Sequence, residues 1–423
     1  MLDMRFIREN DDLVRESHTK RGDNDQVKAL DELLKFDIDW RRLKQETDSI
    51  KMEKNKITSE ISQIKDADDK KNKIDEMRKL SGVIAKNDKK ILSLREAMDF
   101  ILLRMPNVLD KNVPKGDSDE DNKILREWGD KPEFNFKPKN HIDIAEALDL
   151  VDIESAAKVS GARFYYLKNE LVELEFALIK YVMDVLKQEG FDLYTTPALV
   201  RSKVMQGSGF LPAGEEDIYK VVDEDLYLVG TSEQSLSGLH MGETIELDKP
   251  KHYCGYSTCF RTEAGSHGKD TKGIFRVHQF DKIEMFVFCK PEESSKEHEY
   301  LLELAEKIYN GLGIPYRVVD VCTGEMGVVA ARKYDIEAWM PSQDKYREIV
   351  SCSNCTAYQA VGLNIKYRED GISQYVNTLN STACAISRTL VAIIENYQTS
   401  DGTVKIPEVL HKYLDFNEIK LKK

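Results

Sequence analysis

The chain has 423 residues, enough for more than one domain and for a large hydrophobic core. Its charged fraction of 32% and net charge of −13 argue against a membrane protein, and no apolar run approaches the roughly 18 residues that a membrane span requires. Seven cysteines are too few for a disulfide framework in a chain of this length. We expect a soluble protein, and the mixed charges of an N-terminus without a signal-peptide pattern favour the cytoplasm.

Two long amphipathic helices are predicted near the N-terminus. Apolar side chains recur at helical spacing over residues 43–64 and again over residues 74–105, and no proline interrupts either run. A polar turn at residues 65–71 would let the two helices pack as an antiparallel hairpin. A helix of about 38 residues extends on the order of 57 Å, so we expect the hairpin to project as an arm.

The arm carries a local excess of positive charge. Residues 41–65 contain seven basic and four acidic side chains, although the whole protein is acidic. Such an excess suits nucleic-acid phosphates, but an ordinary coiled coil with a solvated charged face has the same pattern. The candidate nucleic-acid contacts are Arg41, Arg42, Lys44, Lys51, Lys54 and Lys56.

A linker is expected after the arm, because prolines and glycines cluster between residues 106 and 138. Helical spacing returns from Glu170 to Glu189 and is closed by Gly190, and a strand is predicted at residues 191–197. The expected domains are the arm at residues 1–108, the linker at 109–160 and the main body at 161–423.

The segment from Phe260 to Glu284 is the most informative part of the sequence. It is predicted to form a strand, a glycine-rich cationic loop at residues 264–273 and a returning strand. Strand alternation would place Arg261 and Glu263 on one face of the first strand. The same rule would align five side chains on one face of the second strand: Arg276, His278, Phe280, Lys282 and Glu284. This face offers an arginine to a phosphate, a ring to a base and a carboxylate to an ammonium group, although a solvated surface hairpin is the structural alternative.

The segment resembles motif 2 of the class II aminoacyl-tRNA synthetases, and its sequence Arg-Val-His-Gln-Phe at residues 276–280 is similar to that of seryl-tRNA synthetases. Three further segments agree in the same order. Thr231-Ser232-Glu233 resembles the serine-binding segment, residues 348–355 resemble the ATP-side strand, and residues 380–382 leading into Arg388 resemble motif 3. The helix and strand over residues 170–197 resemble motif 1, which implies a homodimer.

The resemblance implies an α+β fold, with a long antiparallel α-helical hairpin followed by a class II catalytic domain whose mainly antiparallel β-sheet is flanked by helices. The implied activity is that of a serine–tRNA ligase. Such an enzyme activates L-serine with ATP and Mg²⁺ to seryl-adenylate, then transfers the seryl group to the 3′ end of tRNA(Ser), and of tRNA(Sec) where present. The arm would embrace the long variable arm of the tRNA, and no zinc is expected.

The resemblance also implies roles for individual residues. Arg261 would hold the α-phosphate, Phe280 would stack on adenine, and Glu348 would face the Mg²⁺ that accompanies ATP. The implied catalytic residues are Arg261, Glu348 and Arg388. The implied serine-binding residues are Thr231, Ser232, Glu233, Glu284 and Thr382. The implied ATP-binding residues are Arg261, Thr262, Glu263, Arg276, Val277, Phe280, Glu348, Ile349, Val350, Ser351 and Arg388.

The chain departs from the family pattern shortly after Cys355. Ala357, Val361 and Gly362 stand where the family usually has an acid and two arginines, so charging of the tRNA could be altered. One alternative function is therefore a coiled-coil RNA-binding adaptor with impaired charging. A ligase that charges a carrier protein is another, but it should lack the arm.

Two of the segments named above also allow a purely structural role. Thr382 and its neighbours have good helix-start chemistry, so Thr382 could cap a helix instead of contacting a ligand. Cys352 and Cys355 could bind zinc, but a structural zinc site requires a second pair, for which only Cys254 and Cys259 lie at a suitable spacing.

Overall fold

The computed structural model describes residues 1–264 and 272–421, and it divides the chain into two compact units. The first unit is Met4–Met105 and the second comprises Met1–Asp3 with the chain from Pro106 onward. We refer to them as the arm unit and the body. No helix in these described ranges is long and apolar enough to cross a membrane.

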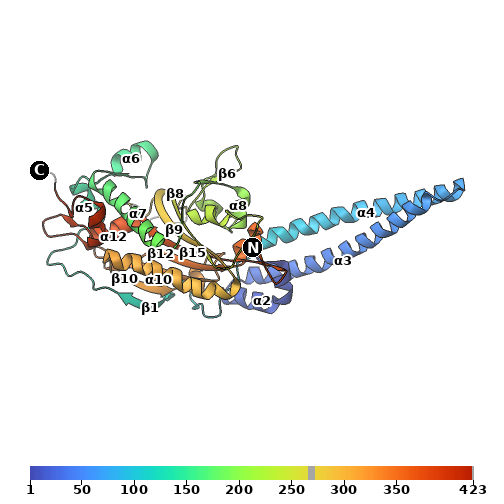
Figure 1. Ribbon diagram of the computed structural model, residues 1–423, viewed down its shortest axis with the longest axis horizontal. Coiled ribbons are helices and arrows are strands. Elements are labelled where there is room, and N and C mark those ends of the chain that lie inside the picture. The colour runs from blue at the N-terminus through green and yellow to red at the C-terminus, as the bar shows by residue number, and fades with distance from the viewer. Residues whose placement is uncertain (265–271, 422–423) are drawn as a thin grey trace. The chain divides into compact units, whose positions relative to one another are not determined.

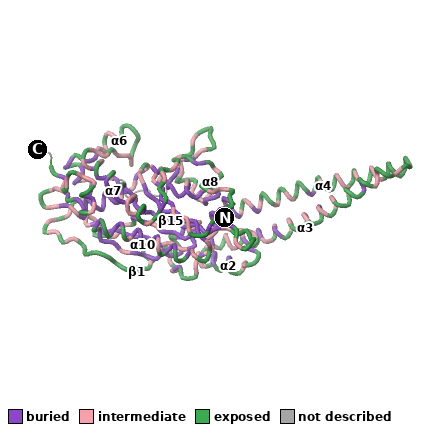
Figure 2. Tube along the Cα trace, viewed as in Figure 1, coloured by how far each residue is buried: buried purple, intermediate pink, exposed green. Residues whose placement is uncertain are grey.

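The arm unit consists of four helices. The short helices α1 (Met4–Glu9) and α2 (Asp11–Lys20) precede the long α3 (Asn24–Ile61) and α4 (Ala67–Leu102), which run antiparallel to each other as Figure 1 shows. Figure 2 shows that most of the hairpin is exposed or half-buried. Ion pairs therefore supplement a thin apolar seam, and Lys51 Nζ reaches from α3 to Asp88 of α4 at 2.9 Å.

The turn of the hairpin lies slightly earlier than predicted. The carboxylate of Asp66 accepts hydrogen bonds from the backbone N–H groups of Asp68 and Asp69 at 3.0 and 2.9 Å. An aspartate in this position stabilises a helix start, because it satisfies backbone donors that have no partner within the helix. Helix α4 therefore begins at Ala67, inside the segment 65–71 that the sequence pattern had suggested as the turn.

The body is built on a mainly antiparallel sheet, which confirms the predicted α+β fold class. The sheet has eight strands, and only the edge pair of β4 and β8 is parallel. In spatial order the strands are β1 (Lys123–Trp128), β10 (Tyr316–Asp320), β11 (Arg332–Met340), β12 (Lys345–Thr356), β15 (Asn377–Ala385), β9 (Gln279–Cys289), β8 (Lys251–Phe260) and β4 (Asp192–Thr195).

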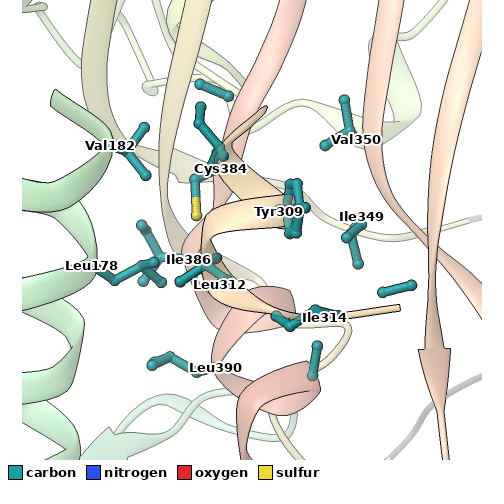
Figure 3. Close-up of a cluster of buried hydrophobic side chains, with 14 of the residues drawn as sticks. Leu178, Val182, Tyr309, Leu312, Ile314, Ile349, Val350, Cys384, Ile386 and Leu390 are labelled. Atoms are coloured by element: carbon teal, nitrogen blue, oxygen red, sulfur yellow. The ribbon is translucent and has the colours of Figure 1, made fainter. Parts of the chain in front are cut away.

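Three helices pack on this sheet through the main hydrophobic core: α7 (Glu170–Gln188), α10 (Ser294–Leu312) and α12 (Ile386–Asn396). Figure 3 shows Leu178 and Val182 of α7 near Ile386 and Leu390 of α12. In the same view Tyr309 of α10 lies between Cys384 of β15 and Ile349 of β12. The Tyr309 hydroxyl lies 2.9 Å from that of Thr389, so this buried ring keeps a hydrogen-bond partner. The core therefore fixes α12 against the sheet.

Shorter elements complete the body. The helices are α5 (His141–Ala147), α6 (Ile153–Ser160), α8 (Ser202–Gly207), α9 (Ser232–Ser237) and α11 (Tyr358–Leu363). The strands outside the large sheet are β2 (Val151–Asp152), β3 (Tyr166–Leu167), β5 (Leu199–Arg201), β6 (Leu226–Leu228), β7 (Thr244–Ile245), β13 (Lys366–Glu369), β14 (Ile372–Tyr375), β16 (Val404–Lys405) and β17 (Glu418–Ile419).

Four local expectations differ from the structure. The segment read as a linker contributes β1 to the edge of the sheet, where it pairs with β10. Strand β8 ends at Phe260 and β9 begins only at Gln279, so the strand face predicted for Arg261 and Glu263 does not exist. Glu263 has a left-handed backbone with φ of +53°, which takes the chain out of the extended conformation.

The same correction applies to the start of the returning strand, because Arg276 and His278 lie before β9. The structure also excludes the alternative that Thr382 caps a helix. This residue lies inside β15, and helix α12 begins four residues later at Ile386.

Candidate active site

One cavity of about 270 Å³ lies over the central strands of the body. Alternation along β9 brings the side chains of Phe280, Lys282 and Glu284 to the cavity wall, as predicted for this part of the strand. The complete lining is Phe210, Thr231, Glu233, Arg261, Glu263, Phe275, Arg276, Val277, Phe280, Lys282, Glu284, Glu348, Ile349, Ser351, Ser353, Asn380, Thr382, Ala385, Ser387 and Arg388.

Most of the predicted serine- and ATP-binding residues are in this lining, and three are not. Ser232 is buried, and its hydroxyl donates a hydrogen bond to the carbonyl of Gly255 at 2.9 Å. Thr262 donates to the carbonyl of Glu216. Val350 is fully buried in the core, where Figure 3 shows it. The structure therefore directs these three side chains to neighbouring backbone or core, and not into the cavity.

Glu284 is the centre of a buried polar cluster. The register of β9 and β15 sets Thr382 directly opposite Glu284. The hydroxyls of Thr231 and Thr382 each lie 3.4 Å from Oε2 of Glu284, and Lys282 Nζ lies 2.6 Å from the same oxygen. The sequence pattern aligned Lys282 with Glu284 but gave it no role, so their pairing is a result of the structure.

Glu233 forms the second acidic group of the cavity. Its Oε1 accepts hydrogen bonds from Gln359 Nε2 at 2.8 Å and from Asn380 Nδ2 at 3.0 Å. Burial and the negative charge of Glu284 raise the pKa of Glu233 to about 7, although the nearby Lys282 opposes this shift. Sequence reasoning missed Gln359 and the amide of Asn380, which come from α11 and β15.

Three arginines also line the cavity: Arg261, Arg276 and Arg388. The Nε of Arg261 donates to the carbonyl of Gly230 at 3.2 Å, and its guanidinium carbon lies 5.3 Å from the ring centroid of Phe280. Arg276 pairs with Glu263 at 2.7 Å. The turn at Glu263 therefore replaces the predicted strand face and still brings Arg261, Glu263 and Arg276 to one cavity.

Arg388 of α12 faces Glu348 of β12. One of its terminal nitrogens lies 3.0 Å from the Glu348 carbonyl oxygen and 3.4 Å from Oε1 of the same residue. Glu348 has a half-exposed side chain. Its desolvation within the cavity would raise its pKa, but the positive charges of Arg388, Lys333, Arg261 and Arg276 together lower it. Glu348 therefore stays ionised and offers carboxylate oxygens at the cavity.

Phe275 is a cavity residue that the sequence analysis did not assign. Its ring centroid lies 4.4 Å from the guanidinium carbon of Arg347 and 5.0 Å from that of Arg388. Its carbonyl oxygen accepts a hydrogen bond from Arg388 Nε at 3.4 Å. An aromatic residue directly before the motif-2 arginine was the only signal in the sequence that could have identified it.

The cysteines do not form a metal cluster in the described parts of the chain, where no group of three or more His, Cys, Asp or Glu side chains could hold a metal ion. All seven cysteines are buried free thiols. Burial raises the pKa of the Cys352 and Cys355 thiols above the ordinary range. These two cysteines therefore behave as small core residues.

The segment that departs from the family pattern lies at a close helix contact. A Cβ atom placed on Gly362 of α11 would lie 2.3 Å from the carbonyl oxygen of Gly207 of α8. Two glycines thus let α8 and α11 touch through their backbones. The structure accordingly has no room here for the arginine that the family usually carries.

In the arm unit, four of the six candidate RNA contacts are engaged in ion pairs. Lys51 pairs across the hairpin with Asp88, as described above. The other pairs stay within α3 and join Arg41 to Asp37, Arg42 to Asp39 and Lys44 to Asp48, at 2.8–2.9 Å. Among the described residues, Lys54 and Lys56 have no ion pair.

Comparison with known proteins identifies the family of the chain. A family model described as the tRNA synthetase class II core domain for G, H, P, S and T matches residues 219–397, and the seryl-tRNA synthetase N-terminal domain matches residues 1–109. The chain is 46% identical to the serine–tRNA ligase of Dictyoglomus thermophilum, with both chains covered completely.

Solved structures show the same similarity. The crystal structure of seryl-tRNA synthetase from Pyrococcus horikoshii complexed with ATP superimposes with a TM-score of 0.95 at 46% identity, and both chains are covered completely. The cytoplasmic serine–tRNA ligase of Naegleria fowleri in complex with AMP gives 0.89 at 36% identity, with coverage of 100% of this chain and 99% of that one. The chain therefore belongs to the seryl-tRNA synthetases, the class II ligases that attach serine to tRNA.

Proposed function

We propose that L-serine and ATP react in the cavity of the body to give seryl-adenylate and pyrophosphate, before the seryl group passes to the 3′ end of tRNA(Ser). The serine carboxylate attacks the α-phosphorus in line, a phosphorus–oxygen bond forms, and the bond to the departing pyrophosphate breaks. This step requires positioning and neutralisation of charge more than proton transfer. The observation that carries the proposal is the presence of three arginines and an acidic, hydroxyl-lined pocket in one cavity.

The arginines are proposed to hold the phosphates. A guanidinium group can bind two phosphate oxygens at once, which suits both ground-state binding and the developing charge. Arg261 would hold the α-phosphate, while Arg276 and Arg388 would contact the remaining phosphates. Phe280 would stack on the adenine, and the position of Arg261 beside its ring supports a site that joins base and α-phosphate.

Glu284 is proposed to bind the serine ammonium group. It is the centre of the buried polar cluster that includes the hydroxyls of Thr231 and Thr382. Glu233 would accept a hydrogen bond from serine through the oxygen that Gln359 and Asn380 leave available. A buried site that hydrogen-bonds a substrate hydroxyl rejects an analogue without it by about 10⁴ to 10⁵, so alanine should be refused.

Magnesium is proposed to enter with ATP at Glu348 and Ser351. Mg²⁺ prefers carboxylate, hydroxyl and phosphate oxygens, and both residues present such oxygens to the cavity. Asp335 lies directly opposite Ser351 across β11 and β12, outside the cavity lining, and its buried Oδ1 has no hydrogen-bond partner among the described residues. The donor chemistry therefore fits the ion, which when bound would neutralise phosphate charge. Zinc has no part in this proposal.

The remaining proposals concern partners and location. The basic side chains of α3 would contact the backbone of the long variable arm of tRNA(Ser), and tRNA(Sec) where the cell has it, because duplex RNA is recognised mostly by shape and phosphates. A homodimer would form through α7 and β4, the elements that resemble motif 1. The enzyme would work in the cytoplasm.

The test is serine-dependent exchange of labelled pyrophosphate into ATP, followed by charging of tRNA(Ser) with the same enzyme. Serine should support exchange, while alanine and threonine serve as controls. Chelation of Mg²⁺ should stop the exchange, and added Mg²⁺ should restore it. The substitution R261K keeps the charge but loses the planar fork, so it should lower the rate of exchange by about 10²-fold or more. Exchange without charging would favour the adaptor alternative, and no exchange with any amino acid would refute the proposal.

A further inference from the structure

His141, the first residue of α5, connects three distant parts of the body. Its backbone nitrogen and its Nδ1 lie 3.1 and 3.3 Å from Oε1 of Glu395 on α12. The backbone N–H of Ile274 donates to its Nε2 at 3.3 Å. Since Nε2 accepts a hydrogen bond, Nδ1 carries the ring proton and donates a hydrogen bond to Glu395. The buried imidazole thus joins Ile274 to α12.

Glu395 holds this histidine in place. Its side chain is fully buried, and its second oxygen accepts a hydrogen bond from the backbone N–H of Ser342 at 3.1 Å. Burial would raise the pKa of Glu395, but the hydrogen bonds from His141 and Ser342 lower it. A buried carboxylate with every oxygen engaged holds its partners in place, because releasing one would leave a buried charge uncompensated.

The imidazole also packs against the backbone of Gly273. A Cβ atom on Gly273 would lie 2.2 Å from His141 Nε2, and the residue has a left-handed φ of +86°. Both facts require glycine at this position. His141 therefore fits against Gly273 and bonds to Ile274, two consecutive residues of the segment that enters the active site.

Phe275 and Arg388 complete a closed connection with α12. The carbonyl of Phe275 accepts the hydrogen bond from Arg388 Nε, and Arg388 and Glu395 are seven residues apart on α12. Seven residues make about two helical turns, so both side chains leave the same face of the helix, about 10 Å apart along its axis. The segment Gly273–Phe275 is thereby tied to α12 at two points.

We propose that His141 is a positioning residue for ATP. It holds Gly273–Phe275 on α12, and so sets the ring of Phe275 and the guanidinium groups of Arg276 and Arg388 at the phosphate end of the cavity. The serine end does not depend on this connection, because Glu284 and Thr382 are held by β9 and β15, and Thr231 caps the start of α9. This inference rests on the function proposed for the cavity.

The test measures KM for ATP and KM for serine separately, by pyrophosphate exchange. H141A should raise KM for ATP about tenfold, as expected for the loss of one or two hydrogen bonds, and should change KM for serine less than twofold. H141Q places an amide oxygen within reach of the Ile274 N–H and should recover part of the loss. H252Q is the matched control, since His252 pairs with Glu297 at 2.7 Å outside the cavity lining.

A double-mutant cycle with G273A tests the contact between Gly273 and His141. In the wild-type background the new methyl group meets both the imidazole and Ile142, whereas in H141A only the contact with Ile142 and the strain of the left-handed backbone remain. G273A should therefore raise KM for ATP more in the wild type than in H141A. If H141A does not unfold cooperatively, the cycle is made with H141S, whose small side chain also removes the contact with the new methyl group.

The two proposals fail in different ways. A wild-type enzyme without serine-dependent exchange would overturn the function of the cavity. An active wild type with unchanged KM for ATP in a folded H141A, equal changes in both KM values, or additive effects in the cycle would each overturn the role of His141.

Discussion

The Nζ atom of Lys282 lies 2.6 Å from Oε2 of Glu284, and both side chains are buried in the cavity wall. The same Glu284 oxygen is the one that faces the hydroxyls of Thr231 and Thr382. The proposed ammonium-binding carboxylate thus already has a resident cation next to it. In the proposed site serine would bind beside Lys282. The positive charge of Lys282 compensates the two nearby carboxylates, Glu284 and Glu233.

Replacing Lys282 with methionine should therefore harm both binding and stability. K282M leaves buried negative charge uncompensated, which typically costs about 3–5 kcal/mol of unfolding free energy. KM for serine in pyrophosphate exchange should rise by about tenfold or more, as the polar cluster loses its arrangement. The control is K290M, because Lys290 pairs with Glu369 outside the cavity and is more exposed, so its loss should cost under about 1 kcal/mol. An unchanged KM for serine in K282M would contradict this role.

The raised pKa of Glu233 predicts a pH-dependent contribution to stability. The ordinary glutamate value is 4.5, and the folded protein holds this pKa at about 7. Between these values the folded state keeps a proton that the unfolded state has lost, so this group lowers the free energy of unfolding as pH rises. E233Q removes the contribution. The unfolding free energy of the wild type minus that of E233Q should fall by about 2–3 kcal/mol from pH 5 to pH 8 in urea titrations. A difference that stays constant with pH would show that Glu233 does not titrate in this range.

The contact between α8 and α11 predicts intolerance at Gly362. G362A places a methyl group against the Gly207 carbonyl and should lower the free energy of unfolding by about 1–3 kcal/mol. G362R, which introduces the residue usual in the family, should be worse and should not improve charging. In the control G327A the new Cβ has no atom within 4 Å, so denaturant unfolding should change by about 0.5 kcal/mol or less. Equal stability of G362A and the wild type would mean that the two helices separate easily.

The basic side chains of the arm predict a separation between activation and charging. Reversing the charge of Lys54 and Lys56 together should leave serine-dependent pyrophosphate exchange unchanged, because both lie in the arm unit. KM for tRNA(Ser) should rise about tenfold or more, and its dependence on salt should become weaker, since fewer phosphate contacts release counterions. K158E, on the exposed helix α6 of the body, is the control. Normal charging by the double variant would place the RNA contact elsewhere.

Several features could be predicted from the sequence because they depend on neighbours in the chain. The helical repeat of apolar residues predicted α3 and α4, since side chains three or four positions apart share a helix face. Alternation along residues 279–289 predicted that Phe280, Lys282 and Glu284 would line one wall, because successive strand residues face opposite sides. The order of the motifs indicated the family before any contact was known.

The tertiary structure decided the rest, because it depends on residues far apart in the chain. Local pattern did not predict that Lys123–Trp128 would join the sheet, that Glu263 would turn left-handed, or that Ser232 would face away from the cavity. His141 meets a carboxylate 254 residues away, and Glu233 takes its hydrogen bonds from residues 126 and 147 positions distant. No periodicity encodes such pairs, since they exist only after the sheet and α12 have packed around one core. The sequence by itself determined which chemical groups are available, and packing decided which of them meet.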